Sequence, residues 1–133
     1  MLKSDTLSIS INRSPQVVYD FVSKAEHLPK WANMFCLSVT RANGDWIVET
    51  PQQGQVKLRF AEGNAFGVLD HYVTVSPGIE VYVPMRVVQN GQGSEVLFTL
   101  FQTKDMPDEK FAEDVRWVNE DRRNLKNVLE AKA

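Results

Sequence analysis

His71 is the residue in this chain best suited to acid–base chemistry. It shares the parity of Leu69, Val73 and Val75 in a segment of alternating residues, so we expect its side chain on the buried face of a strand. A neutral imidazole there could exchange one hydrogen bond with a bound molecule or act as a general base. The alternative is a structural histidine that is satisfied by a backbone carbonyl or a hydroxyl. His27, the other histidine, lies between two short helical segments and is expected to be exposed.

Arg122 is the second candidate, because it interrupts the apolar stripe of the last amphipathic segment. A guanidinium that lines a cavity could bind a carboxylate or a phenolate through two parallel hydrogen bonds. The alternative is that its aliphatic stem packs along the helix while its charged head reaches water or an acid. Four other charged residues occupy polar positions of the alternating segments and are expected to be solvated: Arg59, Glu80, Arg86 and Glu95.

The motifs of several enzyme classes are missing from the sequence. It contains no Cys/His cluster with metal-ligand spacing, no G-x-S-x-G segment and no phosphate-binding glycine loop. Cys36 is the single cysteine, so the chain cannot form an internal disulfide. It alternates out of phase with Phe35 and Leu37, and we interpret it as structural. We therefore expect no metal and no cofactor, and we do not expect metal-dependent hydrolysis, serine hydrolysis or nucleotide chemistry.

The composition is that of one ordinary domain. The chain has 133 residues, of which 43% are hydrophobic and 24% charged, and this suits a single core. The net charge of −2 is spread without a basic cluster, so neither nucleic acid nor an anionic membrane is an expected partner. Residues 1–11 lack the apolar run of a secretory signal, and no window approaches the roughly 18 apolar residues of a membrane span. The prediction is a single domain over residues 1–133, located in the cytoplasm.

Alternating apolar and polar residues predict an antiparallel sheet. The first strand contains Leu7, Ile9 and Ile11, and Ser14 followed by Pro15 predicts the N-cap and first position of a short helix. A second short helix or turn is predicted over residues 26–32. Turn signals at hairpin spacing then separate further strand patterns, which predicts a meander. These patterns cover residues 35–39, 46–48, 56–60, 67–75, 79–87 and 96–101.

A long amphipathic helix is predicted at Pro107–Ala131. Its apolar residues recur every three or four positions, with acids early and bases late, which complements the helix dipole. A sheet with one apolar face must cover that face, and a single helix is the available cover. One helix across a wide curved sheet leaves a gap in which a small apolar molecule could bind.

Several segments resemble the START-like superfamily, which includes Bet v 1 allergens, polyketide cyclases and aromatases, and lipid-transfer domains. The segments that carry the resemblance are Ile9–Ile11 with Ser14–Val22, Leu28–Trp31, Leu69–Val73, Pro84–Val87, Gly93–Phe101 and the final helix. The likeness is greatest to bacterial SRPBCC proteins without assigned chemistry. It implies an α+β helix-grip fold, in which a curved antiparallel sheet of six to seven strands wraps around the C-terminal helix, with two short helices after the first strand. Arg122 departs from the resemblance, which has an apolar residue there.

Three functions are compatible with this fold. The first is binding of a small hydrophobic, aromatic or lipid-like molecule between sheet and helix. The second is a polyketide cyclase- or aromatase-like enzyme that uses His71 as acid or base. The third is a non-catalytic interaction domain with a filled core, for which homodimerisation through a strand or helix edge stays open. The candidate ligand-binding residues are Trp31, Phe35, Trp46, His71, Val83, Met85, Phe98, Phe111, Val115, Val118 and Arg122.

Overall fold

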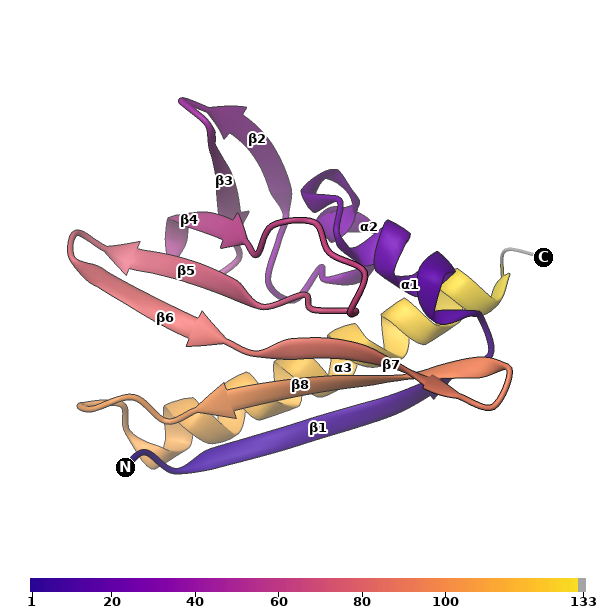
Figure 1. Ribbon diagram of the computed structural model, residues 1–133. Helices are drawn as coiled ribbons and strands as arrows, with labels where there is room; N and C mark the ends of the chain where they lie inside the picture. The colour runs from indigo at the N-terminus through magenta and orange to yellow at the C-terminus, as the bar shows by residue number, and fades with distance from the viewer. Residues whose placement is uncertain (132–133) are drawn as a thin grey trace.

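The computed structural model describes residues 1–131 and contains eight strands and four helices (Figure 1). The chain begins with strand β1 (Ser4–Ile11), helix α1 (Pro15–Val22), the short 3-10 helix η1 (Ala25–His27) and helix α2 (Leu28–Trp31). Seven strands follow: β2 (Ser38–Ala42), β3 (Asp45–Thr50), β4 (Gly54–Phe60), β5 (His71–Ser76), β6 (Ile79–Val83), β7 (Met85–Asn90) and β8 (Gly93–Phe101). Helix α3 (Asp108–Ala131) ends the described chain.

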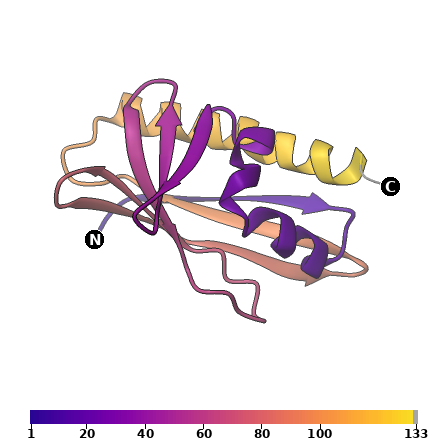
Figure 2. The same cartoon turned by 90° about the horizontal axis from the view of Figure 1, so that it is seen from above.

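The strands form two antiparallel sheets that α3 crosses on one side. One sheet has the order β1-β8-β7 and the other β2-β3-β4-β5-β6. Figure 1 shows α3 running along the three-stranded sheet, while β2 and β3 extend away from the helix towards the top of the view; Figure 2 shows the same arrangement from above. This arrangement confirms the predicted α+β helix-grip fold.

The structure divides the long alternation over residues 79–87 at Pro84. Proline has no backbone N–H to give to a ladder and therefore interrupts a strand. Residues before it, as β6, pair with β5, whereas residues after it, as β7, pair with β8. The strand count is therefore eight in two sheets, where the sequence predicted six to seven in one.

Two other strand boundaries differ from the prediction. Phe35 and Cys36 belong to a turn in which both backbone N–H groups donate to the carbonyl of Ala32, at 2.9 and 2.7 Å. The strand predicted over residues 35–39 thus begins only at Ser38. The strand predicted from residue 67 begins at His71, since Val68 makes only an isolated bridge to β7.

Helices α1 and α3 form where the sequence predicted them. Ser14 caps α1, because its hydroxyl accepts a hydrogen bond from the backbone N–H of Val17 at 3.3 Å, and Pro15 occupies the first turn. Helix α3 begins one residue after the predicted start. Its last turns enter the core, where Leu125 and Leu129 are fully buried.

Candidate functional site

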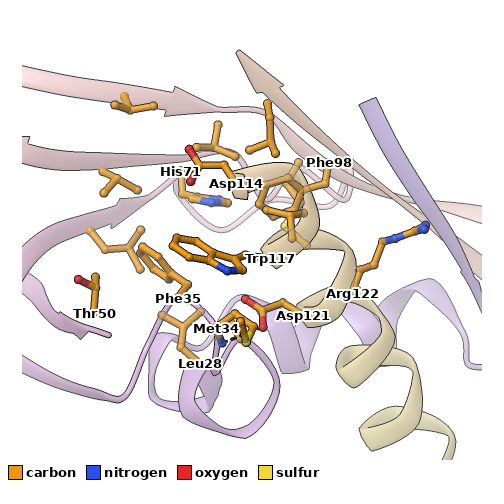
Figure 3. Close-up of a pocket in the computed structure, with 18 of the residues that line it drawn as sticks. Leu28, Met34, Phe35, Thr50, His71, Phe98, Asp114, Trp117, Asp121 and Arg122 are labelled. Carbon is orange, nitrogen blue, oxygen red and sulfur yellow. Dashed lines mark hydrogen bonds between the residues drawn. The ribbon is translucent and has the colours of Figure 1, made fainter. Parts of the chain in front are cut away.

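A cavity of about 230 Å³ lies between the two sheets and α3 (Figure 3). Its walls come from β4 to β8, from α2 with the turn that follows it, and from one face of α3. Most lining side chains are aliphatic or aromatic, as in pockets that bind small molecules. The exposed residues of the β3–β4 turn, at positions 51–53, line its edge, so the cavity reaches the surface there.

Eight of the eleven candidate residues line this cavity: Trp31, Phe35, His71, Val83, Met85, Phe98, Val118 and Arg122. The other three do not. Trp46 packs against the core from β3 with the guanidinium of Arg41 above its ring at 5.1 Å. Phe111 is buried at the start of α3 beneath the ammonium group of Lys3, and Val115 is half-buried on the same helix.

The face of α3 towards the cavity differs from the predicted apolar stripe. The lining positions include Asp114, Trp117, Val118, Asp121 and Leu125, which are related by steps of three or four residues, apart from the adjacent pair Trp117 and Val118, and share one helix face. The cavity face of α3 therefore keeps Val118, Arg122 and Leu125 of the predicted stripe and adds two acids, Asp114 and Asp121, that the prediction did not place there. Trp117 extends across the cavity towards Phe35 in Figure 3.

His71 is buried, with 9% of its surface exposed, and its ring packs near two phenyl rings. Its centroid lies 5.3 Å from that of Phe60 and 5.6 Å from that of Phe98. Its Nδ1 is 3.1 Å from the carbonyl oxygen of Leu69. A carbonyl only accepts, so Nδ1 carries the proton and, in the neutral ring, Nε2 carries the lone pair.

Burial lowers the pKa of His71 below 6.5, against the opposing effects of the Leu69 carbonyl and the Asp70 carboxylate. The ring is therefore neutral at pH 7. No residue within positions 1–131 forms a hydrogen bond with Nε2. Both sequence interpretations thus describe part of this residue: one nitrogen is satisfied by a backbone carbonyl, and the other remains available on the cavity side.

Arg122 reaches the cavity wall but directs its charge elsewhere. Its Nη1 donates to the carbonyl oxygen of Ser8 on β1. In Figure 3 the side chain extends away from the cavity towards that strand. The geometry is that of the alternative interpretation, in which the stem packs along the helix while the head finds another partner.

Asp121 is the buried charged residue on α3, and the sequence analysis missed it. It is 6% exposed, and its Oδ1 accepts a hydrogen bond from the backbone N–H of Met34 at 2.9 Å. Burial raises the pKa of Asp121 to about 7, although backbone hydrogen bonds from Met34 and Phe35 oppose this change. Its position four residues before the buried Leu125 was the available signal.

An ion pair stands at the outer end of the lining. Nζ of Lys110 lies 2.7 Å from Oδ1 of Asp114 and 4.7 Å from the centre of the Trp117 ring. A second acid, Glu113, lies 3.6 Å from the same ammonium group. The positive charge of Lys110 is thus already matched by carboxylates of its own helix.

Cys36 lies in the core rather than in a reactive setting. Its side chain is buried, and burial followed by the nearby charge of Asp121 raises the thiol pKa to about 11. A thiol in this state is a poor nucleophile. Within the described chain no cluster of His, Cys, Asp and Glu could hold a metal ion. None of the described helices combines the length and hydropathy that a membrane crossing requires.

The comparison with known proteins identifies the fold. The sequence matches no family model and no curated protein. Its structure is similar to that of XoxI from Bacillus cereus, with a TM-score of 0.76 and 15% identity over 95% of this chain and 94% of the other. It is also similar to Ara h 8.0201, a Bet v 1-like protein, with a TM-score of 0.74 and 14% identity over 99% of this chain and 100% of the other.

The chain has a START-like fold. A third similar structure is DynU16, a protein of the dynemicin biosynthetic locus, with a TM-score of 0.73 and 11% identity. That match covers 96% of this chain but 47% of DynU16. The START-like fold accounts for the single long helix across a curved antiparallel surface, and at these identities the likeness concerns the fold alone.

Proposed function

We propose that this START-like protein binds a small, mainly apolar molecule in the cavity between the sheets and α3. The observation that carries the proposal is an apolar space of about 230 Å³ that contains a buried, neutral imidazole. A cavity of about 150 Å³ is enough for benzene, and drug-sized ligands occupy about 300–1,000 Å³. The volume therefore supports a ligand of one or two rings, or a short aliphatic chain, and weighs against a filled core.

Binding of an uncharged fluorophore tests the proposal. 1-Aminonaphthalene, a fluorophore of two rings, should give a saturable fluorescence change with the wild-type protein, because burial of a ring contributes about 25 cal/mol per Å² of apolar surface. The double variant Val73→Phe with Val118→Phe adds ring volume to two lining positions, and we expect its affinity to fall at least about 10-fold.

The matched control is Val88→Phe, at an exposed position of β7 outside the lining, and it should bind as the wild type does. Circular dichroism melting curves establish that each variant is folded. Absence of saturable binding to the wild type, or unchanged affinity in the double variant, would count against a binding cavity.

An enzyme of the cyclase or aromatase type is the second candidate. The observation that favours it is the imidazole of His71, which keeps one unpaired nitrogen within an apolar cavity and could move a proton at a bound substrate. The origin of DynU16 in a biosynthetic locus adds support. With a reactive polyketide-like substrate, His71→Gln should lose turnover while substrate binding persists, whereas unchanged turnover would exclude His71 as the acid or base.

A further inference from the structure

We propose that the cavity selects an uncharged aromatic molecule that donates a hydrogen bond to Nε2 of His71, and that it discriminates against carboxylates of the same shape. The inference rests on the proposed function, since it concerns the occupant of the same cavity. It adds that this occupant donates a hydrogen bond and carries no charge.

The direction of the hydrogen bond follows from the tautomer of His71. The Leu69 carbonyl fixes the proton on Nδ1 at 3.1 Å, so the neutral ring offers only an acceptor at Nε2. This acceptor has no partner in the part of the chain that the structure describes. A ligand hydroxyl or N–H would satisfy it, whereas an ether or a carbonyl would leave two acceptors facing each other.

The aromatic character follows from the rings around that nitrogen. Phe60 and Phe98 contact the imidazole in tilted and edge-on arrangements, with interplanar angles of 55° and 68°. In the view of Figure 3, Trp117 and Phe35 lie below His71. A planar ring that reaches Nε2 would pack among these four, where offset and edge-on contacts between rings are favourable.

The discrimination against carboxylates follows from the charges at the cavity wall. Asp121 and Asp114 both belong to the lining. Lys110 is paired with Asp114 at 2.7 Å and Glu113 at 3.6 Å, and Arg122 donates to the Ser8 carbonyl on β1. Both cations of the described lining therefore have other partners for part of their charge, Lys110 through its ammonium group and Arg122 through Nη1, while Nε of Arg122 is buried without a partner. A carboxylate that is buried without a paired cation is disfavoured.

Three naphthalenes of similar shape separate the two parts of the proposal at pH 7.5. These are 2-naphthol, which donates a hydrogen bond, 2-methoxynaphthalene, which only accepts, and 2-naphthoate, which is anionic. Affinities are measured by isothermal titration calorimetry and by quenching of tryptophan fluorescence. We expect 2-naphthol to bind about 3- to 10-fold more tightly than 2-methoxynaphthalene, the usual worth of one neutral hydrogen bond. We expect 2-naphthoate to bind at least about 10-fold more weakly than 2-naphthol.

Two variants of His71 test the assignment to its nitrogen. His71→Phe keeps a ring but removes the acceptor, so 2-naphthol and 2-methoxynaphthalene should then bind equally. His71→Gln keeps a carbonyl acceptor and should retain part of the preference. Arg59→Gln removes an exposed positive charge outside the lining, and as the control for the anion it should leave the weak binding of 2-naphthoate unchanged.

The outcomes distinguish this inference from the proposed function. If the wild-type protein binds 2-methoxynaphthalene and 2-naphthol with equal affinity, the hydrogen-bonding assignment is overturned. This result does not depend on whether the variants fold. If 2-naphthoate binds as tightly as 2-naphthol, the charge assignment is overturned. If neither these probes nor 1-aminonaphthalene binds, the proposed function fails, and this inference fails with it.

Discussion

Oδ1 of Asp121 accepts a hydrogen bond from the backbone N–H of Met34 at 2.9 Å, which ties the middle of α3 to the turn after α2. Both residues line the cavity. The bond thus fixes the distance between two of the cavity walls, at the expense of placing a carboxyl group away from water.

Replacement of Asp121 by Asn should change how stability depends on pH. The pKa of this carboxyl group is raised from 3.8 to about 7 in the folded protein, chiefly by burial. Between these values the folded state binds the proton more strongly than the unfolded state, so this group's contribution to stability falls as the pH rises from about 4 to about 7. Asp121→Asn removes that loss and should raise the free energy of unfolding at pH 8 by about 1–3 kcal/mol.

Urea unfolding of the wild type and Asp121→Asn at pH 5 and pH 8 measures this effect. Asp114→Asn serves as the control, since Asp114 lies on the same helix but is paired with Lys110 near the surface, and a change of no more than about 1 kcal/mol is expected. A difference between wild type and Asp121→Asn that is the same at both pH values would contradict the prediction.

His71 should contribute a pH dependence of stability that is opposite in sign to that of Asp121. Its pKa is lowered by burial, so the folded state disfavours the proton. The corresponding stability is fully present above pH 6.5 and is lost as the pH falls below it. We expect the stability of His71→Phe to be less sensitive to acid. The free energy of unfolding of the variant, relative to that of the wild type, should therefore be higher at pH 5 than at pH 7. His27→Gln is the control, and a parallel acid response of wild type and His71→Phe would argue against a buried neutral ring.

Asp70 holds the corner at which β6 continues into β7. Its carboxylate accepts hydrogen bonds from the backbone N–H of Met85 at 2.9 Å, the hydroxyl of Tyr82 at 3.0 Å and the guanidinium of Arg86 at 3.1 Å. Asp70→Ala should lower the free energy of unfolding by about 2–4 kcal/mol, because the buried Met85 N–H loses its partner. Tyr82→Phe removes one bond at the surface and should cost about 0.5–1 kcal/mol. Equal effects of the two substitutions in urea unfolding would refute this ranking.

Gly67 lies in a backbone conformation and a space that only glycine tolerates. Its φ is +72°, and a Cβ atom would meet the carbonyl oxygen of Val87 at 2.1 Å. Gly44 has a φ of +84° but an open environment, so it isolates the conformational penalty. We expect Gly44→Ala to cost about 1 kcal/mol and Gly67→Ala to cost at least about 2 kcal/mol more, since the close contact must be relieved by moving backbone. Thermal unfolding of the two variants provides the comparison, and similar melting temperatures would disprove it.

Much of the fold could be predicted because its determinants are local. The cap at Ser14 and the apolar repeat of α3 depend on residues within a few positions of one another, and both were predicted to within one residue. The division of one long alternation at Pro84 was not predicted. Alternation shows which face of a strand is buried, but it does not show which partner strand each half will find.

The sequence by itself determined the alternation of the strands, the position of the long helix and the presence of His71 on the inner face, because periods of two and of about 3.6 residues are properties of neighbouring positions. Only the tertiary structure decided which face of α3 meets the cavity. Successive helical residues are about 100° apart, so the rotation of α3 about its own axis decides that Asp114 and Asp121 join Arg122 in the cavity lining. That rotation is set by long-range contacts, including those of Asp121 with Met34 and of Arg122 with Ser8, which lie 87 and 114 positions apart in the chain.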